Sequence, residues 1–90
     1  MQIDELPVPD EVTNATRSIE MARIWVADGR QVVTLNSNIW SDPGNWGIML
    51  VDLARHVSKQ YSQAGHTEED VLSRIRAVFD VEWNHPTDTL

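Results

Sequence analysis

The sequence has 90 residues, of which 41% are hydrophobic and 23% are charged, as expected for one small globular domain. Seven basic and 14 acidic residues give a formal net charge of −7. This charge argues against nucleic-acid and membrane partners, because both classes require a basic surface. The sequence contains no cysteine, which excludes disulfides, thiolate metal sites and cysteine nucleophiles.

Residues 1–16 are predicted to form an extended or mobile N-terminal lead-in. Pro7 and Pro9 stand at alternate positions and favour extended backbone, and the polar segment 11–17 is compatible with one helical turn. The first residues lack the basic and apolar regions of a secretion signal. No segment approaches the roughly 20 apolar residues that a membrane span requires. We therefore expect a cytoplasmic location.

The clearest pattern of the chain predicts a β-hairpin over residues 19–36. Two runs rich in β-branched and aromatic residues flank the pair Asp28-Gly29, and such a pair favours a type I′ turn. With this turn, Ala27 lies opposite Arg30, and Trp25 lies opposite Val32.

This register divides the side chains of the hairpin between two faces, because they alternate along each strand. One face is apolar and is the expected core side: it carries Ala22, Ile24, Val26, Val33 and Leu35. The other face is mixed: it carries Met21, Arg23, Trp25, Val32 and Thr34. An exposed cluster of Trp, Val and Met is typical of an interaction surface. We therefore single out Met21, Trp25, Val32 and Thr34 as candidate interface residues.

Two helices are predicted after the hairpin. The first begins at Ser41-Asp42-Pro43, where a capping oxygen precedes a proline, and runs to about residue 64. Gly65 fits the left-handed position that ends a helix, and Thr67 fits the capping position of the second helix. The second helix ends at Asn84-His85-Pro86. The linker is so short that the two helices should be antiparallel neighbours.

Apolar side chains recur every three or four residues in both helices, which predicts one buried stripe on each. We expect Trp46 and Trp83 to lie in the core and Trp40 to pack against the start of the first helix. Residues 17–85 would then form a single α+β domain, a ββαα unit in which the antiparallel helical hairpin packs on one sheet face. Residues 86–90 would form a C-terminal tail.

Several motifs together resemble a bacterial family of about 90–100 residues that is known as a domain of unknown function. They are the segments 6–9 (LPVP), 20–26 (EMARIWV), 46–47 (WG), 50–57 (LVDLARHV), 74–77 (RIRA) and 79–83 (FDVEW). The resemblance covers nearly the whole chain and implies a stand-alone domain. It implies no activity, cofactor or catalytic residue.

The sequence offers one weak polar site. Asp52 and His56 are four residues apart on the first predicted helix and can meet on one face, either as an acid–base pair or as an ordinary surface ion pair. The three histidines lie in different elements without metal-ligand spacing, and no glycine-rich phosphate motif is present. We therefore predict no catalytic, cofactor or metal residues.

A two-stranded sheet leaves two edges and one face uncovered. Association of two copies through their sheets would solve this, and closed dimers are the commonest oligomers. We expect a non-enzymatic homodimeric interaction or structural module with Met21, Trp25, Val32 and Thr34 at or near the joint. Another protein or a small ligand could bind it in addition. The alternative is a small enzyme with Asp52 and His56 in a dimer cleft.

Overall fold

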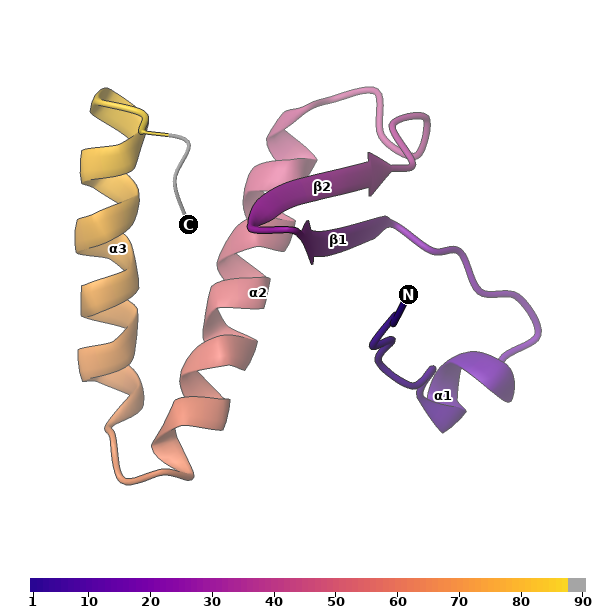
Figure 1. Ribbon diagram of the computed structural model, residues 1–90, viewed down its shortest axis with the longest axis horizontal. Coiled ribbons are helices and arrows are strands. Elements are labelled where there is room, and N and C mark those ends of the chain that lie inside the picture. The colour runs from indigo at the N-terminus through magenta and orange to yellow at the C-terminus, as the bar shows by residue number, and fades with distance from the viewer. Residues whose placement is uncertain (88–90) are drawn as a thin grey trace. The chain divides into compact units, whose positions relative to one another are not determined.

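The structure is a computed structural model that describes residues 1–87. The chain divides into two compact units, the first formed by residues 1–39 and the second beginning at Trp40. The first unit holds a short helix and a β-hairpin, and the second holds two packed helices, as Figure 1 shows. The predicted α+β class, with a β-hairpin followed by a helical hairpin, is thus confirmed. The packing of the helices on a sheet face and the boundaries at residues 16 and 85 stay predictions.

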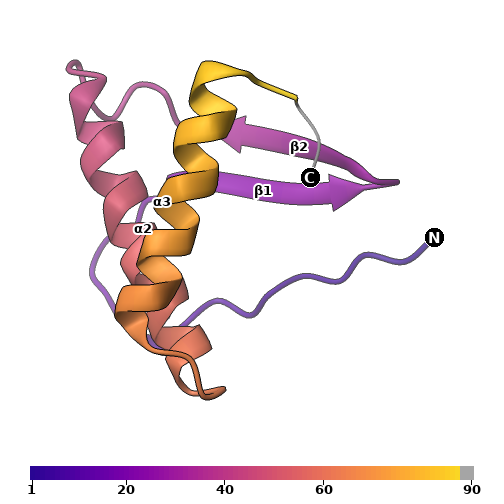
Figure 2. The same cartoon turned by 90° about the vertical axis from the view of Figure 1, so that its left-hand side faces the viewer.

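The β-hairpin has the predicted turn and register. Strand β1 (Ala22–Ala27) pairs antiparallel with β2 (Arg30–Leu35), and Trp25 lies opposite Val32; Figure 2 shows the two opposed arrows. The turn residues Asp28 and Gly29 have φ values of 50° and 78°, as a type I′ turn requires. Both pairings that the turn chemistry predicted are therefore confirmed.

Helix α1 (Asp10–Thr13) is a single turn in the polar segment before the hairpin. Its first residues, Asp10 and Glu11, are acidic, which suits the positive end of a helix. The N-terminal lead-in therefore contains a short helical element, which the sequence allowed over residues 11–17.

Helix α2 (Gly44–Ser62) begins as its sequence predicts and ends two residues earlier than expected. The Asp42 carboxylate accepts a hydrogen bond of 2.9 Å from the Gly44 N–H, so Asp42 satisfies one of the free donors at the helix start. The indole rings of Trp40 and Trp46 meet edge to face at 5.1 Å, which confirms that Trp40 packs against this end of α2.

Helix α3 (Glu68–Asn84) starts at the predicted cap, where the Thr67 hydroxyl accepts a hydrogen bond of 3.1 Å from the Asp70 N–H. The connection from α2 passes through Gly65, whose φ is 99°, the left-handed value expected after a helix end. Helices α2 and α3 pack side by side as antiparallel neighbours (Figures 1 and 2).

Burial within this fold differs from the predicted stripes. Among residues 1–87 no apolar side chain is fully buried, and the one buried side chain is that of Ser58. Ser58 is flanked at intervals of four by Ala54 and Ser62, both partly buried, so the small residues mark the most buried side of α2. Trp83, which was expected in the core, is 74% exposed and stacks on Phe79 at 5.6 Å; the core prediction for Trp83 is wrong.

Candidate interaction site

The mixed face of the β-hairpin brings the candidate interface residues together. Trp25 in β1 lies directly opposite Val32 in β2, and Arg23 lies opposite Thr34. Met21 stands one residue before β1, where its carbonyl accepts a hydrogen bond of 2.9 Å from the Asn36 N–H. The antiparallel pairing therefore extends by one residue pair beyond β1 and β2, and all four candidate residues lie on one face of the hairpin.

Exposure differs among these four residues. Met21 and Trp25 are half-buried, whereas Val32 is 48% exposed and Thr34 is also exposed. The opposite face is exposed as well: Ile24 is 59% and Leu35 is 54% exposed. Thus apolar side chains on both faces of the hairpin are open to solvent within the described chain.

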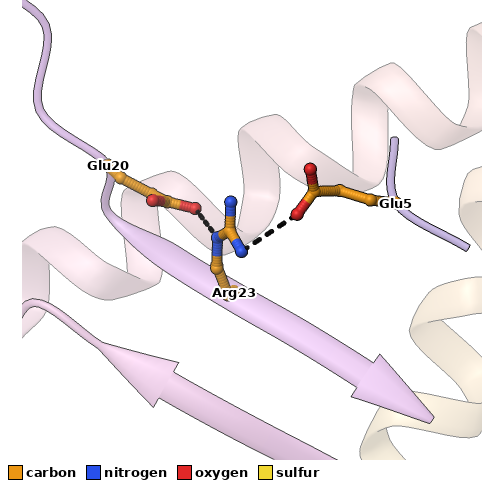
Figure 3. A network of polar contacts seen from close by, with 3 residues as sticks. All are labelled: Glu5, Glu20 and Arg23. Atoms are coloured by element: carbon orange, nitrogen blue, oxygen red, sulfur yellow. Dashed lines mark hydrogen bonds and ion pairs between the residues drawn. The ribbon is translucent and has the colours of Figure 1, made fainter. Parts of the chain in front are cut away.

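Arg23 organises the charged part of the mixed face. Its guanidinium donates hydrogen bonds to the carboxylates of Glu20 and Glu5, the second at 3.2 Å, and Figure 3 shows it between the two. Its central carbon also lies 6.0 Å from the centre of the Trp25 ring, at the limit of a cation–π contact. Arg23 therefore connects the N-terminal segment, the approach to β1 and the indole.

The two carboxylates influence the charge state of this arginine. The hydrogen bond that it donates to Glu20 and the negative charges of Glu20 and Glu5 raise the pKa of Arg23 above its usual value. Arg23 is fully charged at neutral pH in any case, so the effect of the two glutamates is positional: they fix the guanidinium beside the indole.

A shallow hollow of about 310 Å³ lies at the open end of the hairpin. Met21 and Thr34 belong to its lining, and most of the other side chains there are polar. The lining residues are Glu20, Met21, Ala22, Arg23, Thr34, Leu35, Asn36, Ser37 and Asn38. The hollow thus borders the candidate interface and offers hydrogen-bonding groups to whatever lies against it.

The weak polar site lies in α2. The His56 Nε2 atom is 3.3 Å from the Asp52 Oδ2 atom, so the predicted pair forms, and both side chains are 69% exposed. His66 packs edge to face against Tyr61 at 5.8 Å, and His85 follows the last residue of α3. Each histidine accordingly stands in a different local environment.

Residues 1–87 were also compared with the requirements of a metal site and of a membrane-spanning helix. No three side chains of His, Asp or Glu gather there closely enough to hold a metal ion. In the same part of the chain, neither α2 nor α3 combines the length and the apolar character of a membrane span.

Sequence reasoning missed the role of the two glutamates. Glu20 could have been found, because it lies three residues before Arg23. Glu5 stands 18 residues away from Arg23, and no local pattern connects residues at that separation. The contact between the lead-in and β1 therefore emerges from the structure alone.

One solved structure is similar to this chain over almost its full length. It comes from the photosynthetic bacterium Rhodopseudomonas palustrus CGA009 and is described as "a putative pyruvate dehydrogenase". The identity is 33% and the TM-score is 0.73, and the match covers 99% of the present chain and 92% of the other. Among curated proteins, none matches.

The family comparison agrees with the resemblance that the sequence motifs indicated. The model of a domain of unknown function, DUF5076, matches residues 5–87. This range includes both hairpins and the Glu5 carboxylate that binds Arg23. The chain therefore belongs to the DUF5076 family.

Proposed function

We propose that this protein is a non-enzymatic, cytoplasmic interaction module that functions as a homodimer. The mixed face of the hairpin, with Met21, Trp25, Val32 and Thr34, lies at or near the joint between the two copies. A further protein or small ligand would bind to the assembled dimer.

The observation that carries this proposal is the exposure of the hairpin. Every residue of β2 is exposed, and β1 has partly buried residues at only two positions, Ala22 and Trp25. A two-stranded ribbon in water is marginally stable unless a further layer or strand covers it. A second copy of the same chain can supply this cover without any other protein, and closed dimers are the commonest oligomers.

The composition of the mixed face also supports an interface. Tryptophan and arginine are the residues most enriched among the energetically dominant positions of protein interfaces. Here the guanidinium of Arg23 is already held beside Trp25 by two carboxylates. Preorganised side chains lose less conformational entropy on binding, which favours this face over the rest of the hairpin.

The enzymatic alternative receives less support. Asp52 and His56 form the expected pair, but both are 69% exposed, whereas an acid–base pair functions best in a cleft that excludes water. The sequence also carries no glycine-rich phosphate motif.

Light scattering of the purified chain at micromolar concentration tests the proposal, and we expect the mass of two chains. Trp25→Glu should convert the dimer to monomer or to aggregate, because a carboxylate would be placed at or near the joint. Trp83→Glu is the matched control: this indole is 74% exposed on α3, and the dimer should persist. Circular dichroism would verify that both variants retain their helices.

Two results would refute the proposed function. The first is a monomeric mass for the unmodified chain across that concentration range. The second is a dimer that survives Trp25→Glu and is lost in Trp83→Glu, which would move the joint to the helical hairpin.

A further inference from the structure

The two edges of the β-hairpin differ in what the chain places beside them. On the β1 side, Glu20 and Glu5 both reach Arg23, as Figure 3 shows. The strand β2 has neither Pro nor Lys, the residues that commonly protect a free edge from pairing. Its register with β1 runs without interruption over six residues, so no bulge bends the edge away.

The charge along β2 also permits the approach of an identical chain. The segment from Gly29 to Ser41 contains no Asp or Glu, although the protein has 14 acidic residues and a net charge of −7. Two copies that meet along this segment avoid carboxylate repulsion. The single charge of the strand is that of Arg30, at its first position.

The hydrogen bond between Met21 and Asn36 identifies which backbone groups of β2 are free. In an antiparallel ladder, hydrogen-bonded and non-bonded pairs alternate. Since the Asn36 N–H bonds to the Met21 carbonyl, residues 30, 32 and 34 bond to β1. The N–H and C=O groups of Gln31, Val33 and Leu35 must then point to the outer edge.

We propose that this outer edge pairs with the same edge of a second copy, antiparallel and with the two-fold axis at Val33. Val33 then lies opposite the partner's Val33, and Gln31 lies opposite the partner's Leu35. The result is one four-stranded sheet with the order β1, β2, β2, β1. This inference rests on the proposed homodimer and specifies its geometry.

This register is the one in which all three outward residues of β2 find an outward partner. A shift of the axis to residue 32 would place Leu35 opposite Gly29 of the partner subunit, which lies in the turn with a φ of 78°. A shift to residue 34 would place Gln31 opposite Ser37 of the partner subunit, beyond the end of β2. Either shift loses a bonded pair, so the centred register is favoured.

The same register determines which side chains meet on each sheet face. On the face of Val33 and Leu35, Val33 lies beside the partner's Val33, and Leu35 lies beside Gln31 of the partner subunit. On the mixed face, Val32 lies opposite Thr34 of the partner subunit. Two of the four candidate interface residues therefore meet at the joint, and Met21 and Trp25 lie near it, one strand away on the β1 side.

A single-cysteine experiment tests the geometry, because the natural chain contains no cysteine. In a bonded antiparallel pair the two Cα atoms are about 5.5 Å apart, so Val33→Cys should cross-link efficiently within the dimer through a short bis-maleimide. Val26→Cys is the matched control: it changes the same residue type on the same face, but on β1. Its two copies would be at least about 14 Å apart across three strand spacings and should remain unlinked.

Amide hydrogen exchange gives a second readout on the unmodified chain. We expect the outward amides of Gln31, Val33 and Leu35 to exchange at least about tenfold more slowly than the outward amides of Ile24 and Val26 on β1. The difference should disappear on dilution below the dissociation constant. Equal exchange rates on both edges at high concentration would overturn the inference.

Light scattering separates failure of this geometry from failure of the proposed function. A dimer in which Val26→Cys cross-links and Val33→Cys does not would overturn the β2 joint and leave the homodimer intact. A dimer in which neither variant cross-links would likewise overturn this joint. A monomeric chain, as expected if the edge serves a different protein, would overturn both proposals.

Discussion

The β-hairpin and the helical hairpin are both specified by local signals, yet they differ in how far their own residues bury one another. In the helical hairpin, Ser58 is fully buried, and Val71, Leu72 and Ile75 of α3 are partly buried. In the β-hairpin, no residue of β2 is even partly buried. The difference shows that a correct turn and a correct register determine the backbone geometry of a β-hairpin but do not bury its side chains.

The comparison also separates two sources of stability. The helices satisfy nearly all of their backbone hydrogen bonds internally and add caps at Asp42 and Thr67. The hairpin leaves half of the backbone groups of each strand pointing outward, because only alternate pairs bond within a two-stranded ladder. The β-hairpin therefore leaves a larger share of its backbone groups to be satisfied by water or by a partner than the helical hairpin does.

The largest expected difference in stability between the two hairpins comes from replacing one glycine in each of them by alanine. Gly29→Ala forces a side chain into the left-handed region at a φ of 78° and should destabilise the protein by about 1 kcal/mol. Gly47→Ala is the control: Gly47 lies in α2 with open space where the added methyl group would lie, and the change should stabilise by about 0.5 kcal/mol. Urea denaturation measures both, and shifts of the same sign would contradict the role of the turn.

An effect of similar size is expected at the start of α3. Thr67→Ala removes the hydroxyl that accepts from the Asp70 N–H and should cost about 1 kcal/mol. Ser41→Ala tests the other capping position that the sequence offered. We expect less than about 0.5 kcal/mol there, since at the start of α2 the oxygen of Asp42 is the acceptor. An equal loss in both variants by thermal denaturation would contradict this assignment.

The smallest expected effect concerns the contact between the lead-in and β1. Glu5→Gln removes one of the two charges that face Arg23, and because the pair is exposed we expect no measurable change in the thermal midpoint. Limited proteolysis within residues 1–9 should nevertheless become faster, because the segment loses its tether. Glu11→Gln changes an exposed acid of the lead-in outside this network and should leave the cleavage rate unchanged. Identical cleavage rates in both variants and the natural chain would show that the ion pair does not hold the segment.

Local chemistry made much of the fold predictable. The Asp28-Gly29 turn determines the strand register, and Thr67 and Gly65 determine the ends of the helices, since each signal acts within a few residues. Burial was less predictable. The apolar stripe of α2 was expected to be covered, but Leu50, Leu53 and Tyr61 are between 46% and 53% exposed, because the small side chains of Ala54 and Ser58 occupy its most buried side.

The candidate site was also predictable only in part: its position on the hairpin could be predicted, but its contact with the N-terminal segment could not. The faces of the hairpin follow from alternation once the turn is known, so Trp25 and Val32 could be placed together from the sequence. The contact of Glu5 with Arg23 spans 18 residues, and its formation depends on the path of the lead-in. No periodicity encodes that path.

The ion pairs of Arg23 at β1 have a defined response to base. The raised pKa of Arg23 means that its contribution to stability is fully present below the pKa of the unfolded chain and is lost only as the pH rises through the still higher pKa of the folded chain. Alkaline conditions short of that extreme therefore leave the guanidinium in place. Since this guanidinium also binds Glu5, the ion pair that joins the N-terminal segment to β1 persists in base.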